Sequence, residues 1–164
     1  VSKGFEHLIE ALAIAKKELP KSKLALMLSD DPAYQQRKRL LLGRVMELGL
    51  GSFVKVIPPT SRNRLPLHIA AMDCVIVPSL REGFGYAALE PIAMGVPLIA
   101  TKAGSLPEVV SGKHMLVPPA YPVALAKAMI AARKCKMPKT KEKRFLLSEN
   151  IKKYSYVYRS LMRK

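Results

Sequence analysis

Apolar residues follow two alternating patterns along the chain. In some segments they recur every three or four positions, as on one face of an amphipathic helix; Phe5, Leu8, Leu12 and Leu19 form the first such stripe. Between these segments lie short runs that are apolar throughout, which is typical of strands covered by helices on both faces. The predicted helices are residues 3–19, 37–48, 65–72, about two turns ending at Gly95, a short turn at 107–110, 122–134 and 144–162, and the predicted strands are 24–28, 52–57, 73–78, 97–101 and 114–118.

This alternation predicts the fold class. Strands that alternate with helices are usually parallel and joined by right-handed crossovers. We therefore expect an α/β domain with a Rossmann-like, doubly wound parallel sheet of about five strands over residues 1–140. Residues 141–164 are expected to form a basic amphipathic helix. Such sheets often have six strands and the sequence opens on a helix, so we expect the first strand to be missing.

Composition narrows the class of protein. The 164 residues weigh 18.1 kDa, which suits one domain, and 49% of them are apolar, enough for a core and too many for a disordered chain. Cys74 and Cys135 lie too far apart to suggest a small disulfide-framed secreted module. No apolar run is long enough to span a membrane and no signal peptide opens the chain. We expect a piece of a larger cytoplasmic protein, with peripheral contact to the cytoplasmic membrane face left open.

The charge is strongly positive and uneven. The chain has 28 Lys and Arg against 12 Asp and Glu, a net of +16, and residues 133–164 alone contain twelve basic and two acidic residues. A basic end suits an anionic membrane, a phosphorylated ligand or nucleic acid, and it can also be a solvated helix face. An apolar stripe runs through the same segment and indicates packing against another domain or a membrane, with nucleic acid less favoured; the stripe consists of Ile151, Tyr154, Val157, Tyr158 and Leu161.

The turn at residues 81–85, with the sequence REGFG, follows the clearest predicted strand. In a doubly wound sheet ligands bind at the carboxyl ends of the strands, where this turn lies. Gly83 and Gly85 let the backbone approach a ligand, and the helix that follows offers free amides to a phosphate. A Gly-x-Gly turn is also an ordinary strand-to-helix connection, so by itself it identifies no ligand.

Two carboxylates accompany this turn. Glu82 lies within it, and Glu90 follows eight residues later in the predicted helix. Carboxylates only accept hydrogen bonds, which suits the hydroxyls of a sugar or a ribose. A helix that begins between them would let both face one cleft. The alternative is that both are solvated or paired with a local arginine such as Arg81.

The spacing from Glu82 to Glu90 is an E-x7-E pattern that resembles the signature of the retaining glycosyltransferase family 4, which has the GT-B fold. Further segments are similar to this family, in order and at family-like spacing, and together they cover most of residues 3–132. This combination is far more specific than any single motif. The segments are KGFEHLIEAL at 3–12, LPLHIAAMDCVIVPS at 65–79, MGVPLIATKAGSLPEVV at 94–110 and HMLVPPAYPVALAKAM at 114–129.

The resemblance implies that the chain is the nucleotide-sugar-binding half of a GT-B enzyme. Such an enzyme transfers a hexose with retention from a UDP- or GDP-linked donor to an acceptor bound by an N-terminal domain, which this sequence does not include. Glu82 would be the catalytic residue at the donor sugar, as nucleophile or electrostatic partner, and Glu90 would hold the ribose. Lys3 would contact the diphosphate, and the sugar and diphosphate would be cradled by Gly83, Phe84, Gly85 and Tyr86; Val56 and Ile57 are a weaker expectation for the base.

The resemblance implies no cofactor and no metal, because basic side chains and a helix end neutralise the leaving diphosphate. His7, His68 and His114 agree with this, since none has a metal-ligand spacing to another His or Cys.

The sequence departs from the family pattern at three places. The family's Gly-Arg pair before KGFEHL is absent. Two acids stand in the loop Ser29-Asp30-Asp31-Pro32 where a glycine-rich turn is usual, so this loop is expected to point away from a diphosphate or bind differently. Pro91 follows Glu90 and costs a helix hydrogen bond unless the helix starts late.

Two alternatives stay open: a basic polyanion-binding module on a Rossmann-like scaffold, and a GT-B enzyme such as an epimerase that acts on a nucleotide sugar without transferring it.

Overall fold

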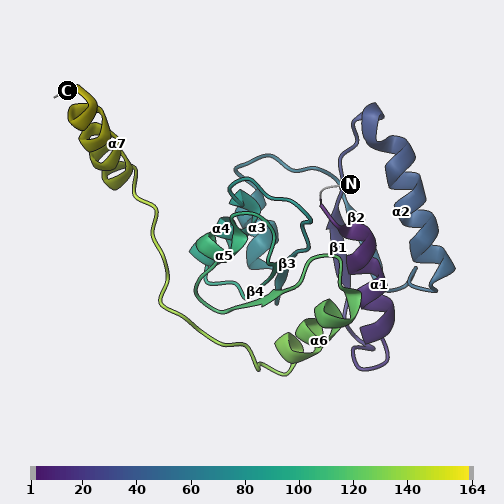
Figure 1. Ribbon diagram of the computed structural model, residues 1–164. Helices are drawn as coiled ribbons and strands as arrows, with labels where there is room; N and C mark the ends of the chain where they lie inside the picture. Colours follow the sequence, from purple (N-terminus) through teal and green to yellow (C-terminus); the bar gives the residue numbers. More distant parts are fainter. Residues whose placement is uncertain (1–2, 163–164) are drawn as a thin grey trace.

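The computed structural model describes residues 3–162, so the basic residues Arg163 and Lys164 at the end of the predicted last helix lie outside the described part. The elements alternate in the predicted order (Figure 1). The helices are α1 (Phe5–Ala15), the short 3-10 helix η1 (Pro32–Tyr34), α2 (Gln35–Glu47), α3 (Leu65–Ala70), α4 (Tyr86–Ala93), α5 (Leu106–Val109), α6 (Pro122–Arg133) and α7 (Leu147–Met162). The strands are β1 (Leu24–Met27), β2 (Val54–Ile57), β3 (Val75–Val77), β4 (Leu98–Thr101) and β5 (His114–Val117).

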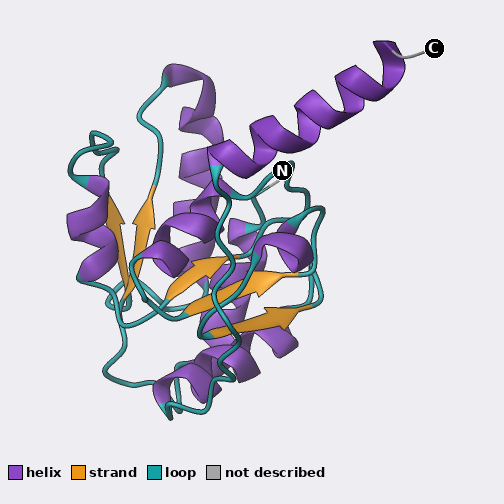
Figure 2. Cartoon of the chain, turned by 90° about the vertical axis from the view of Figure 1, so that its left-hand side faces the viewer, coloured by secondary structure: helices purple, strands orange, loops and turns teal. Residues whose placement is uncertain are grey.

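All the strand pairings in this part of the chain are parallel, as predicted, but they form two sheets instead of one (Figure 2). β1 pairs with β2, and β3, β4 and β5 pair in that order, with Val77 opposite Ala100. In the doubly wound order 3-2-1-4-5-6 the first strand lies between the second and the fourth. The break between β1 and β3 falls where that first strand would lie, and its absence stays a prediction.

The core joins the two sheets through α1. Ile9 and Leu12 of α1 are fully buried, in one cluster with Leu26 of β1 and Ile99 of β4. Burial of each of these side chains contributes roughly 1.5–3 kcal/mol. α1 packs mainly against α6, and the two helices lie side by side in Figure 1. A second cluster, on α4 and α5, covers β3 and β4, so every residue of β4 is buried.

Several element ends differ from the prediction. α1 ends at Ala15, and residues 16–19 form turns that still bury Leu19. Pro91 lies inside α4, in its last turn. Its carbonyl accepts a hydrogen bond from the backbone N–H of Met94, the residue that caps the carboxyl end of the helix. The last helix starts at Leu147 and not near Arg144. Before it, residues 138–143 run beside the segment that leads into β5: Lys139 bridges Lys113, and the N–H of Thr140 donates to the carbonyl of Gly112.

α7 stands apart from the rest of the described chain. It has no buried residue, and it lies at the end of an extended segment in Figure 1. Its apolar side chains, including Ile151, Tyr154 and Leu161, are exposed. Within residues 3–162 no helix has the length and apolar character needed to cross a bilayer.

Candidate functional site

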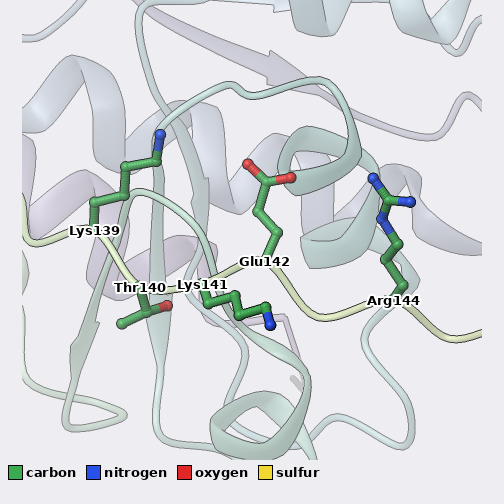
Figure 3. A pocket seen from close by; sticks show the side chains of 5 residues that line it. All are labelled: Lys139, Thr140, Lys141, Glu142 and Arg144. Atoms are coloured by element: carbon green, nitrogen blue, oxygen red, sulfur yellow. The ribbon is translucent and has the colours of Figure 1, made fainter.

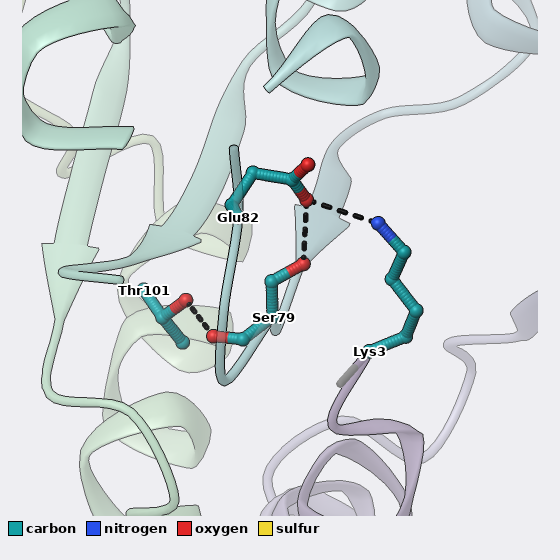
Figure 4. Close-up of polar contacts among 4 residues, drawn as sticks. All are labelled: Lys3, Ser79, Glu82 and Thr101. Atoms are coloured by element: carbon teal, nitrogen blue, oxygen red, sulfur yellow. Dashed lines mark hydrogen bonds and ion pairs between the residues drawn. The ribbon is translucent and has the colours of Figure 1, made fainter. Parts of the chain in front are cut away.

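The turn after β3, residues 78–85, holds a fixed carboxylate; we call it the Glu82 turn. Glu82 Oε2 accepts a hydrogen bond from Ser79 Oγ at 3.0 Å and from Lys3 Nζ at 3.1 Å (Figure 4). The Lys3 side chain is 56% exposed, that of Glu82 is 14% exposed, and Ser79 as a residue is 1% exposed. Within the described chain no hydrogen bond reaches the other oxygen, Oε1. The carboxylate is therefore anchored by one oxygen and leaves the other for a ligand.

β4 holds the turn in place from behind. The buried hydroxyl of Thr101, at the end of β4, donates to the backbone carbonyl of Ser79 (Figure 4). Ser79 lies two residues after the end of β3, and β3 and β4 are paired neighbours, so the ends of both strands hold its backbone. Neither Ser79 nor Thr101 was predicted as a site residue. The available signal was a small polar residue at the end of two neighbouring apolar strands.

Gly104 braces the backbone of Glu82. Its φ is +53°, and a Cβ at this position would lie 2.0 Å from the carbonyl oxygen of Glu82. The next residue, Ser105, donates its N–H to the same oxygen at 3.4 Å. Only glycine allows this approach without displacement of the turn. Gly104 was also missed as a site residue, although it lies inside a segment that carries the family resemblance.

A second glycine brings the start of α1 to the same place. Gly4 has a φ of +64°, and a Cβ there would lie 2.0 Å from the carbonyl oxygen of Pro78. This close contact puts Lys3 beside a carboxylate that is 79 residues away in sequence. The predicted grouping of Lys3 with Glu82 is thus found in the structure, and the partner of Glu82 is Lys3 and not Arg81.

α4 begins directly after the Glu82 turn. Gly85 precedes the helix with a φ of +94°, and no side chain caps the helix. The first-turn amides therefore have no partner within the helix, and together with the helix dipole they favour an anion. Gly85 is required by its backbone angle, whereas Gly83 has open space around its Cα. The rings of Phe84 and Tyr86 pair at 4.9 Å between centroids beside this helix end.

The other predicted site residues lie farther out. Glu90 is exposed on α4, and the structure shows no hydrogen bond or ion pair that joins it to Glu82 within the described chain. Val56 and Ile57 end β2, which belongs to the other sheet, and both are half-buried. The structure thus groups the predicted sugar and diphosphate residues. It does not by itself connect them with the predicted ribose and base residues.

The acidic loop before η1 has its charges occupied. Asp30 pairs with Lys38 at 2.6 Å, and Asp31 accepts a hydrogen bond from the N–H of Ala33 as the cap of η1. These contacts give both carboxylates a local structural role. Among residues 3–162 no group of three or more His, Cys, Asp or Glu side chains could hold a metal ion.

A cavity of about 510 Å³ lies away from Glu82, in the segment that leads to α7 (Figure 3). Lys139, Lys141, Glu142 and Arg144 line it together with Thr140, and all five are exposed. In Figure 3 the side chains of Lys139 and Lys141 extend in different directions and do not converge on one point. Solvated, diverging cations make this cavity a weaker candidate than the Glu82 turn.

Comparison with known proteins gives the site its context. The model of the family described as glycosyl transferases group 1 matches residues 2–154, which is nearly the whole sequence. The chain belongs to this family. The earlier resemblance is confirmed at the level of the group 1 family and of the GT-B fold.

Solved structures confirm the predicted fold. The C-terminal domain of the glycosyl transferase LpcC from Francisella tularensis superposes with a TM-score of 0.73 at 29% identity, over 81% of this chain and 70% of that one. HepE of Anabaena in complex with UDP-glucose superposes with a TM-score of 0.70 at 29% identity, over 81% of this chain and 35% of that one. The present domain is therefore similar to the C-terminal half of GT-B glycosyltransferases.

Curated group 1 relatives are much longer than this sequence. The MMP alpha-(1->4)-mannosyltransferase of Mycolicibacterium hassiacum is 34% identical over 66% of this chain and 25% of its own length. The D-inositol 3-phosphate glycosyltransferase of Jonesia denitrificans is 32% identical over 71% of this chain and 28% of its own length. The chain thus spans about a quarter of the length of these relatives.

Proposed function

We propose that this domain binds the nucleotide-sugar donor of a retaining, family 4-type hexosyltransferase. The observation that carries the proposal is the Glu82 carboxylate, anchored through one oxygen beside the uncapped amino end of α4. A carboxylate accepts hydrogen bonds from sugar hydroxyls, and a free helix end accepts a diphosphate. The two chemistries of a nucleotide sugar therefore have complementary groups side by side.

Each group has a separate role in the proposal. Glu82 contacts the donor sugar at the reacting centre, as nucleophile or as electrostatic partner of the positive charge that develops there. The amides around Gly83 to Tyr86 and the ammonium of Lys3 hold the diphosphate. Preorganised donors of this kind stabilise a leaving anion without a metal ion, so we propose that the reaction needs none.

Glu90 is proposed to hold the ribose, and the end of β2 near Val56 and Ile57 to hold the base. The exposure of Glu90 leaves its carboxylate free to accept from two ribose hydroxyls. HepE, which has a similar C-terminal half, was solved with UDP and with UDP-glucose, and this supports a UDP-linked donor over a GDP-linked one.

The acceptor is proposed to bind to a second, N-terminal domain of the same protein, since the relatives have three quarters of their length outside the matched region. The exposed apolar face of α7 is proposed to pack on that domain. Sedimentation of the chain with vesicles of phosphatidylcholine and phosphatidylglycerol tests the alternative that α7 lies on a membrane. Binding that needs the anionic lipid and is lost on deletion of residues 147–164 would support peripheral membrane contact instead.

The donor site is tested by titration of the chain with UDP, GDP, ADP and pyrophosphate at moderate salt, followed by amide NMR shifts. We expect one nucleotide to perturb a compact set of amides from residues 82–90. Glu90→Gln should lower the affinity for that nucleotide but not the affinity for pyrophosphate. Equal shifts in the basic residues 134–153 with all four ligands, unchanged by Glu90→Gln, would support the polyanion-binding module instead.

A further inference from the structure

The two hydrogen-bond donors on Glu82 differ in how firmly they are held. Lys3 reaches Glu82 from the surface on a flexible stem, and more than half of its side chain is exposed. Ser79 is buried at 1% exposure, and its backbone is fixed by Thr101. Both donate to the same oxygen, Oε2, so within the described chain Oε1 keeps its capacity to accept a hydrogen bond from a ligand.

An incoming diphosphate distinguishes the two donors. This step rests on the proposed function, in which the Lys3 ammonium moves to the diphosphate when the donor binds. Glu82 then keeps only the hydrogen bond from Ser79. The hydrogen bond from the Ser79 hydroxyl, 3.0 Å long, has an ionised acceptor, and hydrogen bonds of this kind are stronger than those between neutral groups.

We infer that Ser79 is the positioning residue for the Glu82 carboxylate, and that Thr101 and Gly104 hold Ser79 and Glu82 at the distance this bond requires. Ser79 touches neither sugar nor diphosphate in this account. It acts by directing Oε1 of Glu82 toward the donor. Gly104 contacts the backbone of Glu82, and Thr101 donates to the backbone carbonyl of Ser79. β4 and the loop after it therefore position both residues that form the hydrogen bond.

The chain offers a matched control for Ser79. Ser111 is equally buried, at 1% exposure, and its hydroxyl also makes one hydrogen bond, from the backbone N–H of Lys143 at 3.0 Å. Ser79→Ala and Ser111→Ala therefore remove the same group from the same degree of burial. Only the first change removes a hydrogen bond to Glu82.

The first measurement needs no ligand. The side-chain carboxyl ¹³C resonance of Glu82 is assigned by its disappearance in Glu82→Gln. We expect Ser79→Ala to shift and broaden this resonance while the other carboxyl resonances stay in place, and Ser111→Ala to leave it unchanged. An unchanged Glu82 resonance in a folded Ser79→Ala chain would overturn the inference, whether or not the chain binds nucleotide sugars.

The second measurement compares UDP-glucose with UDP, and GDP-mannose with GDP, by calorimetry. We expect Ser79→Ala to lower the affinity for the nucleotide sugar about tenfold or more and to leave the affinity for the free nucleotide unchanged. The reason is that the change removes a hydrogen bond to Glu82, which in the proposal contacts only the sugar. In the Glu82→Gln background Ser79→Ala should have no further effect.

The two measurements separate the two proposals. Equal weakening of sugar and nucleotide, or the same loss in Ser111→Ala, would assign Ser79 a purely structural role and overturn the inference. If the wild-type chain binds none of the four ligands, the donor-binding proposal fails. The shifted Glu82 resonance would then still support Ser79 as the residue that positions this carboxylate.

Discussion

The Glu82 turn and the segment we call the tail, residues 134–162, attract attention for opposite reasons. The tail has nine basic and two acidic residues, exposed apolar residues and a cavity of about 510 Å³. The Glu82 turn has little net charge, but its carboxylate, its buried hydroxyl and its backbone carbonyls each have a defined partner. The tail has many cations that are mostly exposed, and the turn has one carboxylate with defined hydrogen-bond partners.

This difference shows why the two functional hypotheses lead to different places in the molecule. A polyanion-binding module needs many cations that can adjust, and the tail provides them. A site that recognises one sugar needs a few groups at fixed distances, and the Glu82 turn provides those. The family match supports the second hypothesis.

The largest expected effect comes from a methyl group placed under the Glu82 turn. Gly104→Ala should lower the free energy of unfolding by about 3 kcal/mol or more, or displace the turn, because the new Cβ meets the Glu82 carbonyl at a left-handed φ. Gly95→Ala is the control, since its φ of +70° is similar but nothing lies within 4 Å. It should cost only about 1–2 kcal/mol of backbone strain. Equal losses on urea denaturation would show that the turn is not braced at Gly104.

The two cysteines differ in burial: Cys135 lies in the tail, and Cys74 lies just before the strand that leads into the Glu82 turn. Burial raises the pKa of the Cys74 thiol, just before β3, from 9.0 to about 11, whereas Cys135 in the tail is exposed. The folded state therefore keeps a proton that the unfolded chain loses above pH 9. Stability from this group is complete below pH 9 and is lost as the pH rises to about 11, by roughly 2–3 kcal/mol in total.

Urea denaturation at pH 8 to 11 measures this loss. Cys74→Ser should remove about 2–3 kcal/mol of the pH dependence, and Cys135→Ser should leave it as in the wild type. A thiol reagent at pH 8 should modify Cys135 well before Cys74. Equal modification rates would contradict the burial of Cys74.

A smaller effect is expected where the two regions meet. Phe145 of the tail packs edge-on against Phe84 of the Glu82 turn, with 6.0 Å between ring centroids. Phe145→Ala should cost about 0.5–1 kcal/mol of stability, since aromatic pairs contribute about this much and both rings are partly exposed. The amides of residues 83–86 should shift in the NMR spectrum. Phe145→Leu, which keeps an apolar contact, should have about half the effect.

The smallest effect is expected at the end of the tail. Deletion of residues 147–164 should change the free energy of unfolding by less than about 0.5 kcal/mol, because α7 buries no side chain. Nucleotide affinity at moderate salt should also stay the same. A large loss of affinity that grows at low salt would move the binding site from the Glu82 turn to the tail.

The sequence predicted the order and type of the elements because each depends on local periodicity. The apolar run at residues 73–78 and the helix stop at Gly95 are local signals of this kind. The strand and the helix that they predicted are both present, as β3 and α4. The split into two sheets could not be predicted, since pairing of strands depends on which neighbour is present. The bridge from Lys139 to Lys113 could not be predicted either, since it is also a contact between distant segments.

The candidate site was predicted by resemblance more than by pattern. Glu82 and Lys3 were both selected, but their hydrogen bond joins residues 79 positions apart and appears only in the fold. Ser79 and Thr101 were missed because a buried serine or threonine at a strand end looks in sequence like any other. Their importance depends on where the hydroxyls point, and only the side-chain geometry shows this.

The contact between Phe145 and Phe84 also limits how far α7 can travel. Phe145 is two residues before Leu147, so the start of α7 stays within a few ångströms of the anchored ring. A partner that binds the apolar face of α7 is thereby held next to the Glu82 turn at a high effective concentration, as if joined to it by a very short linker. The distance of the last helix from the carboxylate thus depends on two aromatic rings.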